Sequence, residues 1–314
     1  MSVDPNFVIV YGALRSGTTL LRLMLNNHPG LNCPGEADYL FDYMSRVPDG
    51  QWALDREGLK RDRIFQAAKI TCSDTLGPKE TIDDLLAQLQ AQGGDGTRLI
   101  LMTHRALDVA LDMYGAVPIV HMLRDPRDVA RSSIGMGWAG DVYHGAFHWI
   151  DTENGWLAVA PNLEQGQHID LRYEDLIRDT EPELDRVARF MGVSFDPAMT
   201  TYDEDSTYSA PDISLIEQWR RKLTPHQIGL VEGRVGPLLT QTGYQPSGHP
   251  TPNLGGLGMA KLKFGNKKAV SQERIRRFGL IDPLLVTISY RLGKPSIAYG
   301  AQQRIDVKTE AYLK

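Results

Sequence analysis

The sequence predicts an α/β protein built on a P-loop-like parallel sheet that is flanked by helices and followed by a C-terminal extension. Residues 7–11, Phe-Val-Ile-Val-Tyr, form an apolar run typical of a buried strand, and a glycine-rich loop and a helical pattern follow it directly. Similar apolar runs recur at 98–103, 118–123 and 167–173, with helical patterns between them. Because parallel strands must be joined by crossover connections, usually helices, this alternation favours a parallel sheet.

The helices are predicted from apolar periodicity and from residues that favour helix ends. Asp125 suits an N-cap, Pro126 suits the first helical position that follows it, and Gly192 suits a helix end. Two stretches give weaker signals. Residues 41–79 are mixed but mostly helical in character, whereas 135–156 could form a pocket wall, a mobile lid or a packed surface loop. The expected helices span 20–27, 81–92, 108–114, 126–134, 182–191, 215–223 and 226–239.

Composition narrows the class of protein. The chain has 314 residues, 42% of them hydrophobic and 23% charged, as in a globular protein with a sizeable core. A net charge of −5 argues against a dedicated nucleic-acid binder. The two cysteines, Cys33 and Cys72, offer neither a disulfide framework nor a metal-ligand spacing. No signal-peptide pattern and no apolar stretch of about 20 residues is present, so we expect a cytoplasmic protein.

The chain divides into a main domain, 1–245, and an extension, 246–314. The extension opens with a Pro- and Gly-rich linker, 246–258, and then becomes basic, with a partly apolar patch at 280–286. Such a segment could lie on an anionic membrane surface or bind an acidic partner. We favour a tail that docks on its own domain or on a second subunit of a homodimer, because charge runs are usually solvated faces.

The loop after the first strand has the features of a phosphate cradle. Its glycines, Gly12 and Gly17, have the spacing of the P-loop pattern G-x-x-x-x-G-K-[ST], but Thr18 stands at the lysine position and the cation is Arg15. Backbone N–H groups and the positive end of the helix would converge on an anion there, with hydroxyl donors from Ser16, Thr18 and Thr19. Since an NTPase needs the lysine and a metal partner, the loop predicts a phosphate-type ligand bound without a metal.

Ionisable residues follow the other predicted strands. His104 and Arg105 close the strand at 98–103, and Arg124 follows the strand at 118–123. Ligands of open α/β sheets bind outside the carboxyl ends of the strands, so these residues are candidates for the same site. Glu36, in a turn-rich loop at 31–36, is either a further site carboxylate or a solvated loop residue.

Taken together, these clusters resemble the sulfotransferases that use 3′-phosphoadenosine-5′-phosphosulfate (PAPS). Residues 12–22 look like the loop that binds the 5′-phosphosulfate, and 124–132 resembles the 3′-phosphate motif, in which an Arg is followed eight residues later by a Ser. The Tyr-Glu-Asp-Leu segment at 173–176 resembles the part that approaches the adenine, and 219–222 resembles the late part of the domain. The resemblance covers roughly 5–245.

The resemblance implies transfer of a sulfuryl group from PAPS to a hydroxyl or amine of a small-molecule, lipid or glycan acceptor. PAPS carries phosphate at both ends of its nucleoside, and the two motifs would supply two anion holders. Arg15 would also stabilise charge on the leaving phosphate. The residues implied in binding PAPS are Arg15, Ser16, Gly17, Thr18, Thr19, Arg124, Ser132, Tyr173, Arg220 and Arg221.

The general base has two candidates. Thr103-His104 resembles the Thr-His of the cytosolic branch, whose His is the base, although Met102 replaces a Lys of that pattern. Glu36 resembles the Glu that serves as base in tyrosylprotein-type members. We favour His104, because an imidazole near its ordinary pKa is largely free to accept a proton at neutral pH.

Two other classes of function fit parts of the sequence. A P-loop kinase or NTPase with a degenerate loop would bind ATP with Mg²⁺. A non-catalytic nucleotide-binding protein would use the basic extension to contact an acidic partner.

Overall fold

The computed structural model describes residues 6–202, 211–292 and 294–313. Residues 1–5 of the predicted main domain lie outside this range, as do 203–210. The strands are β1 (Phe7–Gly12), β2 (Leu31–Asn32), β3 (Met44–Arg46), β4 (Trp52–Leu54), β5 (Arg98–Thr103), β6 (Ile119–Leu123) and β7 (His168–Arg172).

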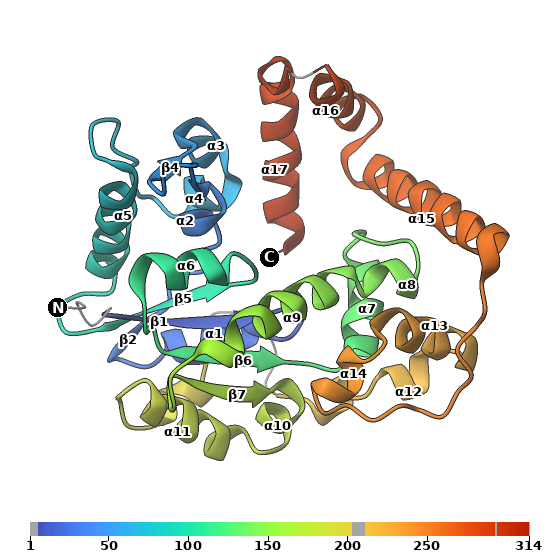
Figure 1. The fold of residues 1–314 in the computed structure, drawn as a ribbon, viewed down its shortest axis with the longest axis horizontal. Coiled ribbons are helices and arrows are strands. Elements are labelled where there is room, and N and C mark those ends of the chain that lie inside the picture. The colour runs from blue at the N-terminus through green and yellow to red at the C-terminus, as the bar shows by residue number, and fades with distance from the viewer. Residues whose placement is uncertain (1–5, 203–210, 293, 314) are drawn as a thin grey trace.

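Helices separate most of these strands and make up the C-terminal part of the chain (Figure 1). The α-helices are α1 (Thr18–Asn26), α2 (Tyr39–Asp42), α3 (Arg56–Arg61), α4 (Arg63–Ala67), α5 (Pro78–Gln92), α6 (Leu107–Tyr114), α7 (Pro126–Gly135), α8 (Val142–Gly145), α9 (Phe147–Val159), α10 (Tyr173–Arg178), α11 (Thr180–Phe190), α12 (Trp219–Lys222), α13 (Pro225–Val235), α14 (Leu238–Gln241), α15 (Gly255–Phe278), α16 (Ile281–Arg291) and α17 (Tyr299–Leu313). Short 3-10 turns are η1 (Ala160–Asn162), η2 (Pro197–Thr200), η3 (Ile213–Leu215) and η4 (Pro295–Ala298).

A five-stranded sheet in the order β2-β5-β1-β6-β7 forms the centre of the fold, and all of its pairings are parallel. The predicted fold class is therefore confirmed, and the four predicted strands correspond to β1, β5, β6 and β7. Strand β1 lies between β5 and β6, so the strand order reverses beside it (Figure 1). The carboxyl end of β1 is thus the place where a parallel sheet of this kind opens a crevice for a ligand.

Successive side chains of β1 point to opposite faces of the sheet, and each face has its own hydrophobic core. Val8 and Val10 pack on one face with residues of α1 and α11. Ile9 and Tyr11 pack on the other face with residues of α5, α6 and α9. All four side chains are almost completely buried. Because successive side chains of a strand point to opposite faces, a strand covered on both sides must be apolar throughout, as the run at 7–11 is.

Three segments differ from the sequence-based expectations. Residues 31–32, expected to lie in a loop, form the edge strand β2 beside β5. The mostly helical stretch 41–79 also contains the antiparallel pair β3–β4, with Gly50 at a positive φ of 82° in its turn. The expected helix at 215–223 is reduced to the four residues of α12. Such short elements carry too few residues for a periodic signal.

Most of the stretch 135–156, which has weak periodicity, lies in helices α8 and α9, while 136–141 connect α7 to α8. Residues of the stretch line a small pocket, as one of the three expectations has it. The buried residues of α9 are Trp149, Thr152, Glu153, Trp156 and Val159, at the spacing of one helix face. Two of these five residues are polar, which interrupts the apolar periodicity. Helix α9 therefore packs one face into the interior, and the polar residues on that face need partners there.

The C-terminal helices α15, α16 and α17 form an arm beside the main body of the fold (Figure 1). Helix α15 contacts the turn after α7, where Asn266 accepts a hydrogen bond from the N–H of Gly140 at 2.6 Å and Arg277 donates to the carbonyls of Gly135 and Met136. Helices α16 and α17 share a small apolar core of their own. Within the described residues, no helix is long and apolar enough to cross a membrane.

Candidate functional site

The loop between β1 and α1 depends on two glycines for its path. A Cβ at Gly12 would lie 2.5 Å from the carbonyl oxygen of Met122 on the neighbouring strand. Gly17 has a φ of 94°, and a Cβ there would lie 2.3 Å from the ring of Tyr173. Arg15, between them, also has a positive φ of 74°, which is uncommon for a residue with a side chain. The loop is therefore held in one tight conformation at the carboxyl end of β1.

The start of α1 is open to an anionic ligand. Among the described residues, no side chain caps this end of the helix. Its first N–H groups therefore remain for solvent or a ligand, and the helix dipole adds partial positive charge. The buried hydroxyl oxygen of Ser16 also has no hydrogen-bond partner within the described chain. This set of donors can hold a phosphate-type group.

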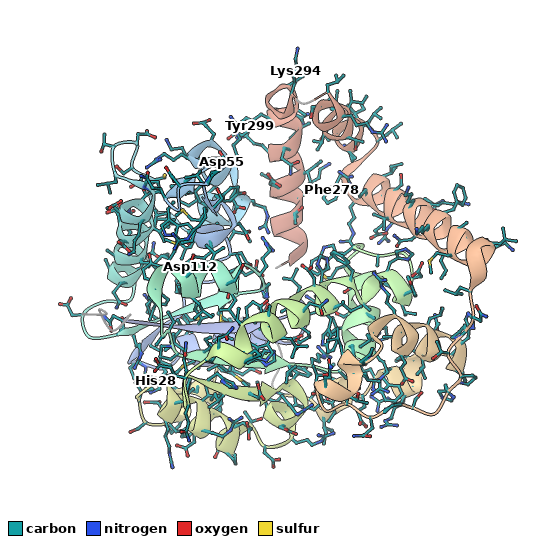
Figure 2. The ribbon with its side chains drawn as sticks, viewed as in Figure 1. His28, Asp55, Asp112, Phe278, Lys294 and Tyr299 are labelled. Carbon is teal, nitrogen blue, oxygen red and sulfur yellow. The ribbon has the colours of Figure 1, made fainter. Side chains whose placement is uncertain are left out.

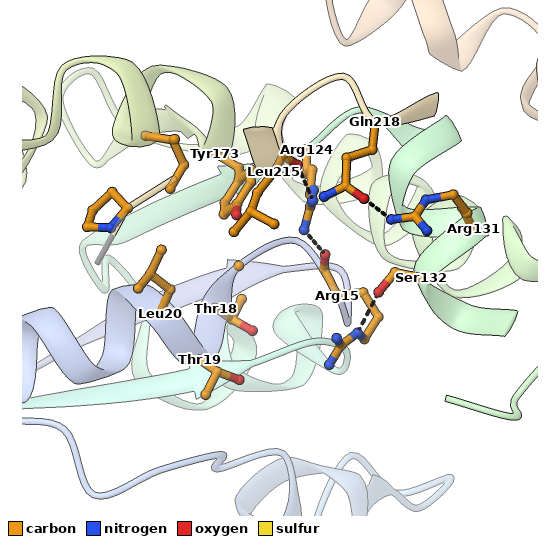
Figure 3. Close-up of a pocket in the computed structure, with 13 residues that line it drawn as sticks. Arg15, Thr18, Thr19, Leu20, Arg124, Arg131, Ser132, Tyr173, Leu215 and Gln218 are labelled. Atoms are coloured by element: carbon orange, nitrogen blue, oxygen red, sulfur yellow. Dashed lines mark hydrogen bonds between the residues drawn. The ribbon is translucent and has the colours of Figure 1, made fainter. Parts of the chain in front are cut away.

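A cavity of about 370 Å³ opens in front of this loop, between α1, α7 and α10 (Figure 3). Its wall combines loop residues and cations with apolar side chains. It is lined by Arg15, Gly17, Thr18, Thr19, Leu20, Arg124, Arg131, Ser132, Tyr173, Ile177, Pro211, Leu215 and Gln218. The sequence-predicted Arg15, Gly17, Thr18, Thr19, Arg124, Ser132 and Tyr173 thus meet in one cavity.

Arg124 connects the loop to the far wall of the cavity. Its guanidinium donates to the carbonyl oxygens of Arg15 at 3.0 Å and of Leu215 at 3.1 Å, and it lies 4.0 Å from the ring centroid of Tyr173 (Figure 3). The buried Nε of Arg124 has no hydrogen-bond partner within the described chain. The side chain is therefore fixed in place while one of its donors remains for a ligand.

Helix α7 contributes two further polar side chains to the cavity. Ser132 accepts a hydrogen bond from Nε of Arg15 at 2.9 Å, so the loop and α7 are in direct contact. Arg131, which the sequence reasoning missed, donates to the amide oxygen of Gln218, and its buried Nε has no partner among the described residues. The position of Arg131 within the predicted 124–132 motif, next to Ser132, could have indicated its role. No pattern in the sequence pointed to Gln218.

The residues predicted to lie near the adenine are partly structural. Tyr173 lines the cavity, whereas the next residue, Glu174, accepts a hydrogen bond from the N–H of Asp125 at 3.0 Å and one from the hydroxyl of Tyr244 at 3.1 Å. Glu174 therefore fixes the start of α7. Arg220 and Arg221 are exposed, and neither lines the cavity.

Their contacts are local. Arg220 pairs with Glu217 at 3.1 Å, and Arg221 donates to the carbonyl of Ser214 at 2.6 Å. The structure therefore does not bring these two predicted residues to the other site residues.

The two candidate bases face each other on the opposite side of the loop. Glu36 forms a bridge with Met102 at the edge of β5, and His104 follows the end of β5. The Nε2 atom of His104 lies 3.8 Å from a carboxylate oxygen of Glu36, too far for a hydrogen bond but close enough for an ion pair. The Glu36 side chain is 40% exposed, whereas that of His104 is 3% exposed. Solvent or a substrate can therefore reach Glu36 more easily.

Backbone contacts fix the orientation of His104. Its Nδ1 lies 2.6 Å from the carbonyl oxygen of Gly12, and because a carbonyl can only accept, Nδ1 carries the proton. Its backbone N–H donates to Asp38 at 2.7 Å, and its carbonyl accepts from the hydroxyl of Thr152 at 2.9 Å. Sequence reasoning identified neither Asp38 nor Thr152. These bonds aim Nε2 toward Glu36.

Glu36 and His104 shift each other's pKa in the direction that favours the charged forms of both. Burial lowers the pKa of His104, but the facing Glu36, Asp38 and the Gly12 carbonyl raise it more, so the pKa lies above its usual 6.5. His104 in turn holds the pKa of the Glu36 carboxyl below its usual 4.5, despite the opposing effect of burial. Between these two pKa values, Glu36 is ionised and His104 is protonated.

Helix α9 links the two sides of the site. Thr152 binds the carbonyl of His104, and one turn earlier the indole N–H of Trp149 donates to the carbonyl of Arg124 at 2.9 Å. Both side chains are buried. The buried residues Thr152 and Trp149 of this helix therefore position the residues that follow β5 and β6, respectively. In the part of the chain that is described, no cluster of three or more His, Cys, Asp or Glu residues could hold a metal ion.

The fold and this loop identify a family. The sulfotransferase family matches residues 5–197, which span the sheet, the loop and the cavity-lining parts of α1, α7 and α10. This chain belongs to the sulfotransferase family. The resemblance seen in the sequence is confirmed at this level.

Curated relatives agree with the assignment. The nodulation protein NoeE of Sinorhizobium fredii is 25% identical over 292 residues, which cover 77% of this chain and 67% of the relative. Protein-tyrosine sulfotransferase A of Caenorhabditis elegans is 20% identical over 274 residues, covering 79% of this chain and 70% of the relative.

Solved structures show the same fold. The sulfotransferase domain from the curacin biosynthetic pathway matches with a TM-score of 0.57 and 18% identity, covering 77% of this chain and 98% of that domain. The sulfotransferase domain of the Synechococcus PCC 7002 olefin synthase matches with a TM-score of 0.54 and 21% identity, covering 74% and 98%. At these identities the likeness concerns the fold.

Proposed function

We propose that this protein transfers a sulfuryl group from PAPS to a hydroxyl or amine of its acceptor. The observation that carries the proposal is a single cavity lined by two groups of donors suited to anions. One group is the loop and the start of α1, and the other consists of Arg124, Arg131 and Ser132. PAPS has a phosphate at each end of its nucleoside, and the apolar side chains of Leu20 and Ile177 in the same cavity suit that nucleoside.

The reaction requires an in-line displacement at sulfur. The acceptor oxygen or nitrogen forms a bond to sulfur while the bond from sulfur to the 5′-phosphate oxygen breaks, and 3′,5′-ADP leaves. Negative charge develops on the phosphate, where the loop N–H groups and Arg15 are placed to stabilise it. The acceptor must lose a proton to a base on the other side of the loop.

The geometry favours Glu36 as that base, although the sequence alone favoured His104. Glu36 is ionised at neutral pH because its pKa is lowered, and its side chain is 40% exposed. His104 is buried, and its raised pKa keeps the proton on the imidazole. In this arrangement His104 stabilises and orients the carboxylate, and Glu36 accepts the proton of the acceptor.

The pH dependence of kcat distinguishes the two bases. If Glu36 is the base, activity falls only when the pH drops through a pKa below about 4.5. If His104 is the base, activity is lost as the pH falls through a pKa above about 6.5. The wild type is measured with sulfur-labelled PAPS and saturating acceptor, found by screening sugars, lipids, phenols, amines and peptides. Full activity at pH 5.5 would exclude His104 as the base.

Two variants complete this test. Glu36→Gln keeps the shape of the side chain and should lower kcat at least about 100-fold, while His104→Gln should lower it less.

A thermal-shift comparison separates the sulfotransferase proposal from the other classes of function. Stabilisation by 3′,5′-ADP without Mg²⁺ supports the proposal, whereas stabilisation by ATP only with Mg²⁺ supports a kinase or NTPase. Binding of 3′,5′-ADP without transfer to any acceptor would favour a non-catalytic nucleotide-binding protein.

A further inference from the structure

The C-terminal extension, residues 246–314, contains the arm formed by α15, α16 and α17 (255–313) and differs from the rest of the chain in charge. Residues 246–314 contain 12 Lys and Arg against 4 Asp and Glu, whereas residues 1–245 contain 22 Lys and Arg against 35 Asp and Glu. The net charges are therefore +8 and −13. A protein whose overall net charge is negative thus carries a strongly basic C-terminal extension.

The same arm exposes large apolar side chains. Twelve such residues lie on it, against six in the remaining described chain: Leu257, Phe264, Ile275, Leu280, Ile281, Leu284, Leu285, Ile288, Leu292, Ile297, Tyr299 and Val307. Single exposed apolar residues are ordinary, but a concentration of them on one segment marks an interaction surface. Figure 2 shows Phe278, Lys294 and Tyr299 on this arm, away from the central sheet.

Helix α15 has two distinct faces. Its inner face contacts the turn after α7 and neighbouring apolar residues, through Leu262, Asn266, Ala269, Glu273 and Arg277. At 100° per residue, the opposite face carries Leu257, Lys261, Phe264, Lys268 and Ile275. Leu257 and Phe264 are 74% and 72% exposed. Within the described chain, neither Lys261 nor Lys268 forms an ion pair with a carboxylate.

Helix α16 repeats this arrangement with a stronger apolar face. Val286 packs inward on Ala298, Ala301 and Ile305 of the arm. The outer face has the helical spacing i, i+3, i+4, i+7 and consists of Ile281, Leu284, Leu285 and Ile288, and Leu292 continues it directly after the helix. Each of these side chains is at least 45% exposed.

We propose that the outer faces of α15 and α16 dock the protein on the surface of an anionic phospholipid bilayer. Exposed apolar side chains interleaved with lysines on one helix face are the arrangement that an interfacial helix needs, since the apolar groups enter the headgroup boundary and the cations attract anionic lipid. The charge of the arm complements such a surface, and the −13 of residues 1–245 favours contact through the arm alone.

A second copy of the chain is the competing occupant. Its main body has the opposite charge. Within 6–202 and 211–245, however, the six exposed large apolar side chains, at 76, 138, 147, 157, 213 and 215, are spread over several elements and form no stripe to match α16. An arm-to-arm contact would bring two strongly basic segments together. The bilayer therefore satisfies both the apolar and the charged parts of the surface.

The test is co-sedimentation of the full-length protein with vesicles of phosphatidylcholine alone or mixed with phosphatidylglycerol. We expect binding to the mixed vesicles at low salt, weak binding to phosphatidylcholine alone, and release as salt rises. Lys261→Glu with Lys268→Glu should weaken binding at least about 30-fold, and Leu284→Ser with Ile288→Ser at least about tenfold.

Matched controls make equivalent changes of charge and of apolar side chains on the main body. Lys69→Glu with Arg189→Glu, and Leu76→Ser with Leu157→Ser, should leave vesicle binding unchanged, and all variants should retain 3′,5′-ADP binding as a check of folding. No binding to mixed vesicles at low salt, or equal binding to both vesicle types, would overturn the proposal. Loss of a dimer in the Leu284→Ser, Ile288→Ser variant, without vesicle binding by the wild type, would instead assign the surface to a second copy.

Discussion

Two glycines with similar positive φ angles allow the cost of a positive φ to be measured apart from the cost of a steric clash. Gly17 has a φ of 94° and Gly50 a φ of 82°. A Cβ at Gly17 would lie 2.3 Å from the Tyr173 ring, whereas a Cβ at Gly50 would have no atom within 4 Å among the described residues. Gly17→Ala and Gly50→Ala therefore share the backbone strain, and only the first adds a clash.

The expected magnitudes follow from these contacts. The left-handed conformation costs a side chain about 1–2 kcal/mol, so Gly50→Ala should lower the free energy of unfolding by that amount. Overpacking adds about 1–3 kcal/mol, so Gly17→Ala should lower it by about 2–5 kcal/mol. Since Tyr173 also lies against Arg124, its displacement should weaken 3′,5′-ADP binding in Gly17→Ala alone.

Urea unfolding of both variants and calorimetric titration with 3′,5′-ADP provide the measurements. If both variants lose the same stability and both bind the nucleotide as the wild type does, Tyr173 does not constrain the loop and the account of the loop is incorrect.

Three further predictions concern buried polar contacts. Thr152→Val should lower the free energy of unfolding by about 1–3 kcal/mol and reduce kcat, because the carbonyl of His104 loses its hydrogen-bond donor. Thr152→Ser keeps the hydroxyl and serves as the control. Equal kcat in the two variants would refute this role of Thr152. Arg124→Lys keeps the charge but loses the forked contacts, so calorimetry should show about tenfold weaker 3′,5′-ADP binding, and unchanged affinity would contradict it. Burial raises the pKa of Asp128 from 3.8 to about 6, so its contribution to stability is present at low pH and is lost as the pH rises through 6. Between pH 4 and 7, urea titrations should show Asp128→Asn gaining up to about 3 kcal/mol relative to the wild type, and a pH-independent difference would argue against a buried carboxylate there.

The sequence predicted the parts of the fold that rest on contiguous signals. The strand at 7–11 is buried on both faces, so all of its residues are apolar and the run is visible without the structure. The two phosphate-type motifs are likewise continuous, and their residues meet in the cavity because β1 and β6 are neighbouring strands.

The remaining parts depend on contacts between distant residues. Helix α9 was missed because Thr152 and Glu153 lie on its buried face. The facing of His104 and Glu36 arises from the parallel bridge between Glu36 and Met102, which no local pattern encodes. The exposed positions of Arg220 and Arg221 follow from the shortening of the expected helix to α12, with local partners for both guanidinium groups.

The proposed function requires one cavity to bind two separate phosphates of one nucleotide. Calorimetric titration of the wild type with 3′,5′-ADP and with 5′-AMP, which lacks the 3′-phosphate, tests this claim most directly. We predict that the wild type binds 3′,5′-ADP about 10- to 100-fold more tightly, since charge-assisted hydrogen bonds contribute about 1.5–3 kcal/mol each. Arg131→Ala should reduce this preference while affinity for 5′-AMP stays the same. Equal affinity of the wild type for the two nucleotides would contradict the two-phosphate site.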